Sequence, residues 1–356
     1  MKNILLLALC TLALLPVGCG CLPPMRVHSQ GDMNVSVRTP LAAKVDATVN
    51  TISDPGAFRE VVIPPCSAPT DDKIALIDVD GLLVNFNRVG AYSLGENPVA
   101  SFQEKLTAAA ADPAVKAVVL RINSPGGGVA AAELMGRSLA DFRQHSRKPV
   151  VACLLDLGTG GGYYLASGCD QILAIPAAVV GGIGVKLNLY YLEIAMEQWN
   201  VFGAPVKSGE RIDMGTPTRK MTAEEKAMLT SMAREYHENF KQVVLRNRPR
   251  LSAEASLFDG RVMTASKAAE GGLIDGVGFL PDALERARQL AGLGPAQVVM
   301  YSRCTSPART LYDVAPNRPV QGLNVPWSVP GLDRNRLPLF LYLWEVEPTM
   351  MRIAPD

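Results

Sequence analysis

The sequence predicts an α/β protein in which a mainly parallel sheet is flanked by helices. Three short apolar runs, at residues 74–79, 115–122 and 149–155, have the length and β-branched content of buried strands. Segments of helical composition separate the runs, and a glycine-rich loop follows both the second and the third run. Strands that are apolar throughout and alternate with helices are typical of a parallel sheet covered on both faces. Such a sheet carries its chemistry in the loops at the carboxyl ends of its strands.

Local signals place the helices between these strands. Asn97 suits an N-cap and Pro98 suits the first helical position, so a helix is predicted to begin there. A second helix is expected over residues 129–146, after the first glycine loop. Thr222 and Glu225 form a capping-box pattern at the start of a long helix. The other expected elements are a strand at 171–175 and helices at 163–167 and 282–290.

The composition excludes several classes of protein. A chain of 356 residues with 48% hydrophobic and 19% charged residues can bury a sizeable core. Its 35 Lys and Arg residues balance 34 Asp and Glu residues, so the formal net charge of +1 excludes a polybasic nucleic-acid binder. Its seven cysteines include no CxxC pair, and no histidine lies at metal-ligand spacing. The sequence therefore predicts no metal site, no cofactor and no disulfide framework.

The N-terminus resembles an export signal. Lys2 precedes an apolar run over residues 4–17, which is too short for a bilayer core about 30 Å thick but suits a signal peptide. The run ends at Gly18 and Cys19, which resemble the lipobox of bacterial lipoproteins, although Pro16 departs from that motif. We therefore expect an exported protein of the bacterial cell envelope, held at the membrane by lipid on Cys19, with ordinary secretion as the alternative.

Composition also divides the rest of the chain. Residues 1–19 are predicted to be the leader, 20–70 an irregular tether, 71–294 the folded domain and 295–356 an irregular, Pro-rich C-terminal extension. Within that extension, residues 337–346 have the strongly apolar sequence LPLFLYLWEV, which is too short to cross a membrane. We expect this run to form a strand or plug that packs on the domain or on another subunit.

Five short motifs occur in the order typical of one known protein family. They are Asn-Ser-Pro-Gly-Gly at 123–127, Gly-Gly-Tyr-Tyr at 161–164, Val-Lys-Ser-Gly at 206–209, Asp-Gly-Arg-Val at 259–262 and Gly-Leu-Ile-Asp at 272–275. Together they resemble the signal peptide peptidase A (protease IV) family. That resemblance implies the Clp-protease/crotonase-like fold and a membrane-associated serine protease that hydrolyses signal peptides or other short peptides.

The resemblance implies catalysis by a Ser-Lys dyad. In this mechanism a serine attacks the peptide carbonyl, and a lysine that its surroundings keep neutral accepts the serine proton. The lysine position corresponds to Lys207, which is therefore the expected general base. The backbone N–H groups of Gly126 and Gly161 correspond to the oxyanion donors, and Gly127 belongs to the same substrate-binding loop. A peptide substrate or ligand is expected to bind as an added strand beside this loop.

The nucleophile position departs from the family pattern. Gly160 stands where the family has its serine, immediately before Gly-Gly-Tyr-Tyr. Thr159 is the nearest hydroxyl, but a shift of one residue at a helix start turns a side chain by about 100°. Ser124 is a weaker substitute, because its position fits a turn hydroxyl. A Ser-His-Asp triad is not expected, because no strand-end loop contains one of the three histidines, His28, His145 and His237.

Functions of different classes therefore remain open. One is a peptidase of this family, and another is a catalytically inactive homologue that binds peptides or serves in assembly. A third and weaker alternative is a crotonase-type acyl-thioester enzyme, which shares the fold and the oxyanion site. Because relatives of this fold stack into rings, we also expect a homo-oligomer, with the long helix after Thr222 as the candidate interface.

Overall fold

The computed structural model describes residues 58–64, 70–86, 96–189, 191–251, 255–303 and 340–344, together with two strands nearer the N-terminus. These two strands, β1 (Asn34–Arg38) and β2 (Lys44–Thr48), pair antiparallel within a first unit, Met1–Thr51. The second unit, Ile52–Asp356, contains the large sheet and its helices. The predicted leader and Cys19 lie outside the described residues.

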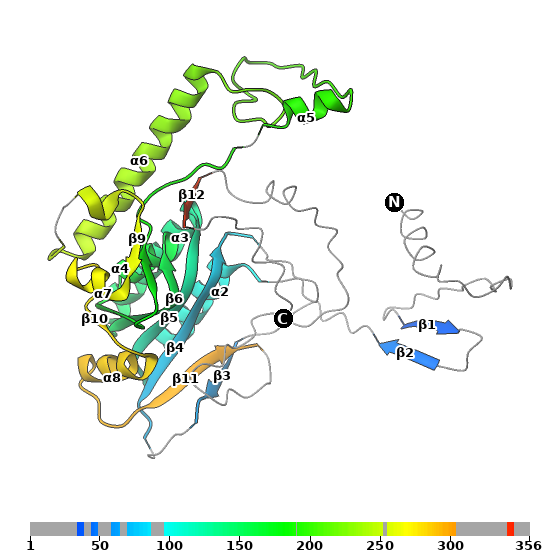
Figure 1. Cartoon of the computed structure of the whole chain (residues 1–356). Coiled ribbons are helices and arrows are strands. Elements are labelled where there is room, and N and C mark those ends of the chain that lie inside the picture. Colours follow the sequence, from blue (N-terminus) through cyan, green and yellow to red (C-terminus); the bar gives the residue numbers. More distant parts are fainter. Residues whose placement is uncertain are drawn as a thin grey trace. The chain divides into compact units, whose positions relative to one another are not determined.

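The second unit is built on a large, mainly parallel sheet (Figure 1). Its strands follow the order β10-β7-β6-β5-β4-β11-β3, and every neighbouring pair is parallel except β11 and β3. The predicted α/β class with a mainly parallel sheet is therefore confirmed. The bounds are β3 (Arg59–Val62), β4 (Lys73–Leu83), β5 (Val115–Gly128), β6 (Val150–Thr159), β7 (Gln171–Ala174), β10 (Gly276–Val277) and β11 (Gln297–Ser302). Three strands lie off this path: β8 (Val179–Gly181) between β6 and β9 (Val262–Thr264), and β12 (Leu341–Leu343) beside β5.

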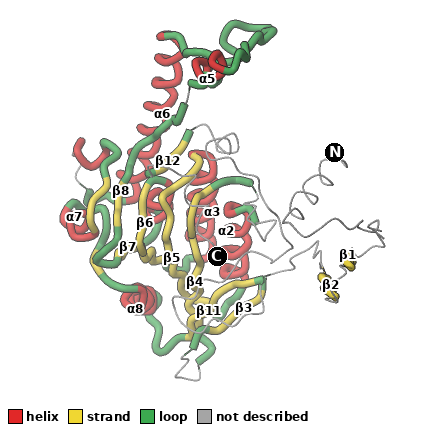
Figure 2. The backbone as a smooth tube through the Cα atoms, turned by 45° about the vertical axis from the view of Figure 1, so that its right-hand side comes forward, coloured by secondary structure: helices red, strands yellow, loops and turns green. Residues whose placement is uncertain are grey.

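Helices cover both faces of the sheet, as Figures 1 and 2 show. Alternate residues of β4 divide between two cores: Ala75 and Ile77 pack in a large apolar cluster, and Ile74 and Leu76 in a smaller one beside α8. Helices α2, α3, α4, α6 and α7 contribute to the large cluster. The bounds are α2 (Pro98–Ala111), α3 (Val129–Ser146), α4 (Gly161–Ser167), α5 (Glu193–Gln198), α6 (Ala223–Asn247), α7 (Ala265–Glu270), α8 (Leu280–Leu290) and the 3-10 helix Ala255–Phe258.

The predicted helix starts are confirmed by their hydrogen bonds. The Asn97 side chain accepts a hydrogen bond from the Val99 N–H at 3.0 Å, and Pro98 occupies the first position of α2. The Glu225 N–H donates to Thr222 Oγ1 at 3.2 Å, and the Thr222 N–H donates to Glu225 Oε2 at 2.8 Å. This reciprocal pair is the predicted capping box, and it begins the 25-residue helix α6.

The two expected glycine loops differ from the prediction, because the first is entirely strand and the second is strand up to Thr159, with helix α4 beginning at Gly161. β5 continues to Gly128 and β6 to Thr159, beyond the apolar runs that marked them in the sequence. The end of β5 has partners on both edges: Leu82 of β4 pairs with Gly126 on one side, and β12 pairs with Gly126 on the other. A segment with two paired edges adopts extended structure whatever its composition, so the glycines extend the sheet instead of ending it.

Among the described residues, no helix combines the length and the apolarity needed to cross a bilayer. The same part of the chain holds no group of three or more His, Cys, Asp or Glu side chains that could bind a metal ion. Both cysteines within it, Cys153 and Cys169, are buried as free thiols, and burial raises the pKa of each well above its usual range.

Candidate functional site

The carboxyl ends of β5 and β6 lie side by side and bring the two glycine motifs together. Ser124 of β5 pairs with Gly158 of β6 in the ladder. The Gly161 nitrogen lies 2.8 Å from the point where a Cβ atom on Gly126 would lie, and a Cβ atom on Gly161 would lie 3.4 Å from the Gly127 nitrogen. The three glycines predicted to bind substrate are therefore neighbours in the fold, and their role in binding stays a prediction.

Gly160 forms the sharp turn between β6 and α4. Its φ of +52° and ψ of −123° lie in a backbone region that residues other than glycine rarely adopt. Its N–H donates to the Gly181 carbonyl at 3.0 Å, and its own carbonyl accepts from the Tyr164 N–H at 2.9 Å. A strained turn from strand to helix is where a nucleophilic serine is presented in other hydrolases. In this chain the turn has the matching conformation and carries no side chain.

The two hydroxyls nearest to Gly160 have different surroundings. Ser124 Oγ is buried, donates to the Gly81 carbonyl at 2.6 Å and accepts from the Gly126 N–H at 3.1 Å. Ser124 therefore stabilises its own turn, and the Gly126 N–H already has a partner there. Thr159 is also fully buried, but its hydroxyl has no hydrogen-bond partner among the described residues.

The expected plug is β12, and it lies directly beside the glycine motif of β5. Residues Leu341–Leu343 pair antiparallel with Gly126–Gly128, so the described part of the run predicted at 337–346 packs on the domain as a strand. The other edge of β12 meets Lys186, through reciprocal backbone hydrogen bonds between Leu341 and Lys186 of 3.1 and 3.2 Å. The space between Gly126–Gly128 and Lys186, the β12 site, thus binds an extended strand on both of its edges.

Tyr342 anchors the strand in the β12 site. Its ring is fully buried against Tyr164 of α4 and Phe240 of α6, with centroid distances of 5.7 and 4.5 Å. Its hydroxyl donates to the Tyr236 carbonyl at 2.9 Å. Burial raises the pKa of the Tyr342 hydroxyl and raises that of Tyr164 to about 12, so both hydroxyls stay protonated at physiological pH. An aromatic pocket with one polar acceptor therefore holds the central side chain of β12.

The backbone of Tyr342 crosses the turn at Gly160. A Cβ atom on Gly160 would lie 2.7 Å from the carbonyl carbon of Tyr342 and 3.0 Å from the nitrogen of Leu343. Both distances are at or below the shortest separations that a real Cβ atom shows. The Tyr342–Leu343 peptide bond therefore occupies the space that a nucleophile's side chain would need at position 160. Sequence reasoning missed this relationship, because the apolar run gives no signal of its register.

Lys207 lies on an arm, residues 191–222, that includes α5 and leads into the N-terminal end of α6. Figures 1 and 2 both place this arm at the outer end of α6, away from the sheet. Lys207 Nζ pairs there with Asp213 at 3.0 Å. Arg219 first, and then Lys207, hold the pKa of Asp213 well below its usual range. The structure therefore does not bring Lys207 to Gly160 within one chain.

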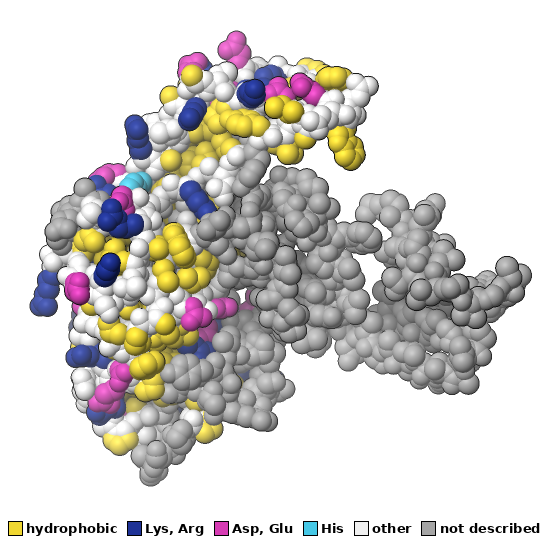
Figure 3. Space-filling model, in the orientation of Figure 1, with side chains coloured by type: hydrophobic (Ala, Val, Ile, Leu, Met, Phe, Trp, Pro, Cys, Tyr) yellow, Lys and Arg dark blue, Asp and Glu magenta, His cyan; other side chains and the backbone are white. Residues whose placement is uncertain are grey.

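The arm exposes large apolar side chains around Lys207. Trp199 is 82% exposed and Phe202 is 71% exposed, and Val206 and Ile212 are also exposed. Figure 3 shows hydrophobic side chains gathered along this part of the surface. A contiguous apolar surface on a projecting segment is typical of an interaction site.

Comparisons with known proteins agree with the motif order. The profile of Peptidase family S49 matches residues 142–294. A Synechocystis protein named "Putative protease" is 30% identical over 238 residues, which are 67% of this chain and 81% of that protein. The chain belongs to the S49, or SppA, family of serine peptidases. The Enterococcus faecium protein named "Putative signal peptide peptidase SppA" is 29% identical over 67% of this chain and 69% of its own length. A Methanocaldococcus jannaschii protein named "Putative protease" is 34% identical over 191 residues, which are 53% of this chain and only 61% of that protein.

As an S49 member, the chain has the α/β architecture with a central, mostly parallel sheet that is consistent with the Clp-protease-like fold of the family. The matched residues include Gly160 and the Gly-Gly-Tyr-Tyr motif, as well as Lys207. They do not include Asn-Ser-Pro-Gly-Gly or β12, which lie outside residues 142–294.

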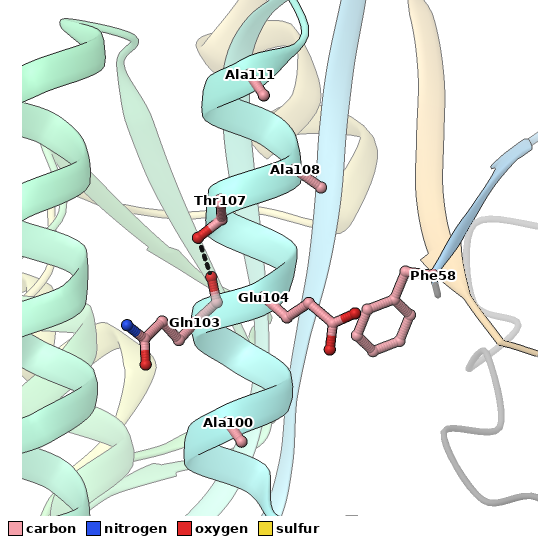
Figure 4. A pocket seen from close by; sticks show the side chains of 7 residues that line it. All are labelled: Phe58, Ala100, Gln103, Glu104, Thr107, Ala108 and Ala111. Carbon is pink, nitrogen blue, oxygen red and sulfur yellow. Dashed lines mark hydrogen bonds between the residues drawn. The ribbon is translucent and has the colours of Figure 1, made fainter. Parts of the chain in front are cut away.

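A separate pocket of about 520 Å³ lies beside α2 (Figure 4). Its lining contains one carboxylate, Glu104, which is ion-paired with Arg303. Its other polar groups include Gln103 and Thr107, and the Thr107 hydroxyl donates to the Gln103 carbonyl at 2.9 Å. This lining offers neither a paired nucleophile and base nor a glycine motif, so the β12 site is the better candidate for the functional site.

Proposed function

We propose that this S49 chain binds extended apolar peptides by strand addition at the β12 site and does not hydrolyse them. The observation that supports the proposal is the Tyr342–Leu343 peptide bond, which lies over the turn at Gly160, where the residue has no side chain. Strand addition gives affinity through the main chain, and side-chain pockets give specificity. The β12 site offers both, in its two paired edges and its aromatic pocket.

The chemistry at the turn argues against hydrolysis. Acyl transfer needs a nucleophile within hydrogen-bond reach of its base. Gly160 supplies no nucleophile, the buried Thr159 hydroxyl has no hydrogen-bond partner among the described residues, and Lys207 is paired with Asp213 on the arm. Loss of the nucleophile in a serine peptidase costs several orders of magnitude in rate, and binding can persist without it.

The proposal is tested with purified full-length protein and fluorescein-labelled signal peptides. With protein in excess, we expect the fluorescence anisotropy to rise, while mass spectrometry after prolonged incubation finds the peptides intact. Casein is the matched substrate for general proteolysis and is also expected to stay intact. Peptide fragments whose production stops in Lys207→Ala would overturn the proposal and favour a peptidase.

Hydrolysis is the second candidate, because the chain belongs to a family of serine peptidases. In this alternative Thr159 is the substitute nucleophile, since its hydroxyl is unpartnered in the described part of the chain. Lys207 would then reach the turn of a neighbouring copy and not that of its own chain. Peptide cleavage that requires both Thr159 and Lys207 would decide for this candidate.

We further propose that the protein self-associates and that the arm is the interface between copies. The side chains of Trp199, Phe202 and Ile212 support this proposal, because they flank Lys207 in the sequence and are exposed in the described part of the chain. The partner that we propose is a second copy of this chain. Contact through the arm would place Lys207 of one copy against the other copy. Sedimentation analysis tests the proposal, and a monomer at high concentration would contradict it.

We also propose export to the bacterial cell envelope, with lipid on Cys19 as the membrane anchor. The support is in the sequence alone: Lys2, the apolar run over residues 4–17 and Gly18 before Cys19. Mass spectrometry of the mature N-terminus in wild type and Cys19→Ser tests the anchor. An unmodified N-terminus at or after residue 19 would indicate ordinary secretion.

A further inference from the structure

The orientation of β12 distinguishes it from the strands around it. β4, β5 and β6 are parallel to one another, whereas β12 pairs antiparallel with the last residues of β5. Its flanking residues extend the pairing: the Val129 N–H donates to the Phe340 carbonyl at 3.2 Å, and the Trp344 N–H donates to the Pro125 carbonyl at 2.9 Å. Five consecutive residues, 340–344, therefore lie along β5 in the manner of an added peptide.

The side chains of this segment show what the β12 site selects. Leu341, Tyr342 and Leu343 are all buried, and Trp344 is partly exposed. The ring of Phe340 meets that of Tyr236 edge-on at 4.9 Å. The deepest pocket is the aromatic one around Tyr342, and its single polar partner is the Tyr236 carbonyl. A tyrosine at this position donates a hydrogen bond to the Tyr236 carbonyl that an aliphatic side chain cannot make, and its ring fills the aromatic pocket.

The seating of the segment depends on glycine at position 160. A side chain there would begin 2.7 Å from the Tyr342 carbonyl carbon, and its close neighbours are backbone atoms of Tyr342 and Leu343. Backbone that is hydrogen-bonded on both edges moves aside less readily than the end of a flexible side chain does. The absence of a side chain at position 160 therefore removes the nucleophile and also leaves the space that β12 occupies.

We propose that residues 340–344 are the resident ligand of the β12 site, and that external peptides must displace them by presenting a tyrosine, or another aromatic residue, at the position of Tyr342. This inference rests on the proposed function, because it names the peptide class that the same site binds and the segment that competes for it. A site that is open for only a tenth of the time binds its ligand about tenfold more weakly.

The first test measures competition in the full-length protein. The probe is a fluorescein-labelled peptide with the sequence of residues 337–346 and a lysine tail for solubility. We expect Tyr342→Ala to bind this probe at least tenfold more tightly than wild type, because the resident segment loses its anchor. Leu290→Ala, which removes an exposed apolar side chain on α8, is the control and is expected to bind as wild type does. A probe with alanine at the tyrosine position is expected to lose binding to Tyr342→Ala.

A second test measures the seating directly, by hydrogen exchange of the amides of residues 340–344. In wild type these amides are expected to be protected, and in Gly160→Ser their protection is expected to fall at least tenfold. Gly292→Ser is the matched control: it too replaces a glycine of positive φ, +65°, but nothing lies within 4 Å of the new Cβ atom. It is expected to leave residues 340–344 protected.

The possible results separate the two proposals. Full protection of residues 340–344 in Gly160→Ser, or equal probe binding by wild type and Tyr342→Ala, would overturn the resident-ligand inference and leave peptide binding intact. Protected amides together with no probe binding by any variant would instead overturn the proposed function, because the β12 site would then be a permanent part of the fold. Tighter binding by Tyr342→Ala with a tyrosine-dependent probe supports both proposals.

Discussion

The carbonyl carbon of Tyr342 lies 2.7 Å from the point that a Cβ atom on Gly160 would occupy. These residues are far apart in the sequence, and Gly160 has no side chain that could contact Tyr342. They exclude each other nevertheless, because a side chain at one position and the backbone at the other need the same space. A substitution at Gly160 therefore tests the catalytic turn and the C-terminal strand together.

The buried hydroxyl of Thr159 predicts a stabilising substitution. Thr159→Val keeps the shape of the side chain and removes a buried polar group that has no partner among the described residues. An unsatisfied buried group costs about 1–3 kcal/mol, so we expect the free energy of unfolding to rise by about 1 kcal/mol. Chemical denaturation measures this change. Ser124→Ala is the contrast, and it should destabilise the protein because the Ser124 hydroxyl makes two buried hydrogen bonds.

The same Thr159→Val variant also tests the alternative nucleophile. If the protein has peptidase activity that depends on Thr159, the valine variant loses it while remaining folded. We expect no such loss, since no base lies beside the hydroxyl in the described structure.

The charged cluster at the start of α6 predicts an acid-sensitive arm. Arg219 above all holds the pKa of Glu225 at about 2, below its ordinary value of 4.5. A carboxylate whose pKa is lowered by folding contributes stability that is complete above pH 4.5 and disappears as the pH falls toward 2. We expect hydrogen exchange of the arm and of the first turn of α6 to increase across this window.

Arg219→Ala is the matched test of this pH dependence. Without the guanidinium, the pKa of Glu225 rises toward its ordinary value, so opening should begin at a higher pH than in wild type. An unchanged pH profile in Arg219→Ala would show that the capping box alone holds the start of α6.

The apolar surface of the arm predicts its effect on assembly. Phe202→Asp places a charge on a side chain that is 71% exposed, so it should cost little in the isolated fold but disrupt an interface. We expect the sedimentation coefficient to fall toward that of a monomer. Leu134→Asp, on the exposed face of α3, is the control and should leave assembly unchanged. Equal assembly of both variants would show that Phe202 of the arm is not part of the interface.

Removal of one partner of the buried ion pair between Asp78 and Arg121 is predicted to lower the stability of the protein strongly. The pair lies between β4 and β5 with a distance of 2.6 Å, and its side chains are only 6% and 3% exposed. Asp78→Ala leaves a buried charge with one partner fewer, at a cost of about 3–5 kcal/mol in the free energy of unfolding. Asp141→Ala, which breaks an exposed pair with Arg137 on α3, should cost no more than about 1 kcal/mol. Urea denaturation compares the two.

The alternation of strands and helices could be predicted because each strand is a mainly apolar run and each helix cap depends on residues close in the sequence. Asn97 and Thr222 mark helix starts through hydrogen bonds within four residues, so their sequence signal survives without tertiary information. The extent of β5 could not be predicted in this way. Gly126 is extended because strands distant in sequence pair with both of its edges, and no local pattern encodes that pairing.

The candidate site was predictable in part. The family motifs correctly indicated that Gly126 and Gly161 lie near each other, because both follow neighbouring parallel strands. The position of Lys207 could not be derived from Val-Lys-Ser-Gly, since a four-residue motif does not fix where an arm projects. The run at 337–346 predicted a strand, but it lacks the polar and apolar alternation that would have fixed its register.

β12 also has a consequence for solubility. Two unpaired strand edges, one at Gly126–Gly128 and one at Lys186, would face each other if the segment left, and exposed edges recruit strands from other molecules. A peptide that displaces residues 340–344 covers the same edges, whereas a chain cut before residue 340 leaves them bare. We therefore expect the C-terminal strand to lower the tendency of the protein to aggregate by covering both edges.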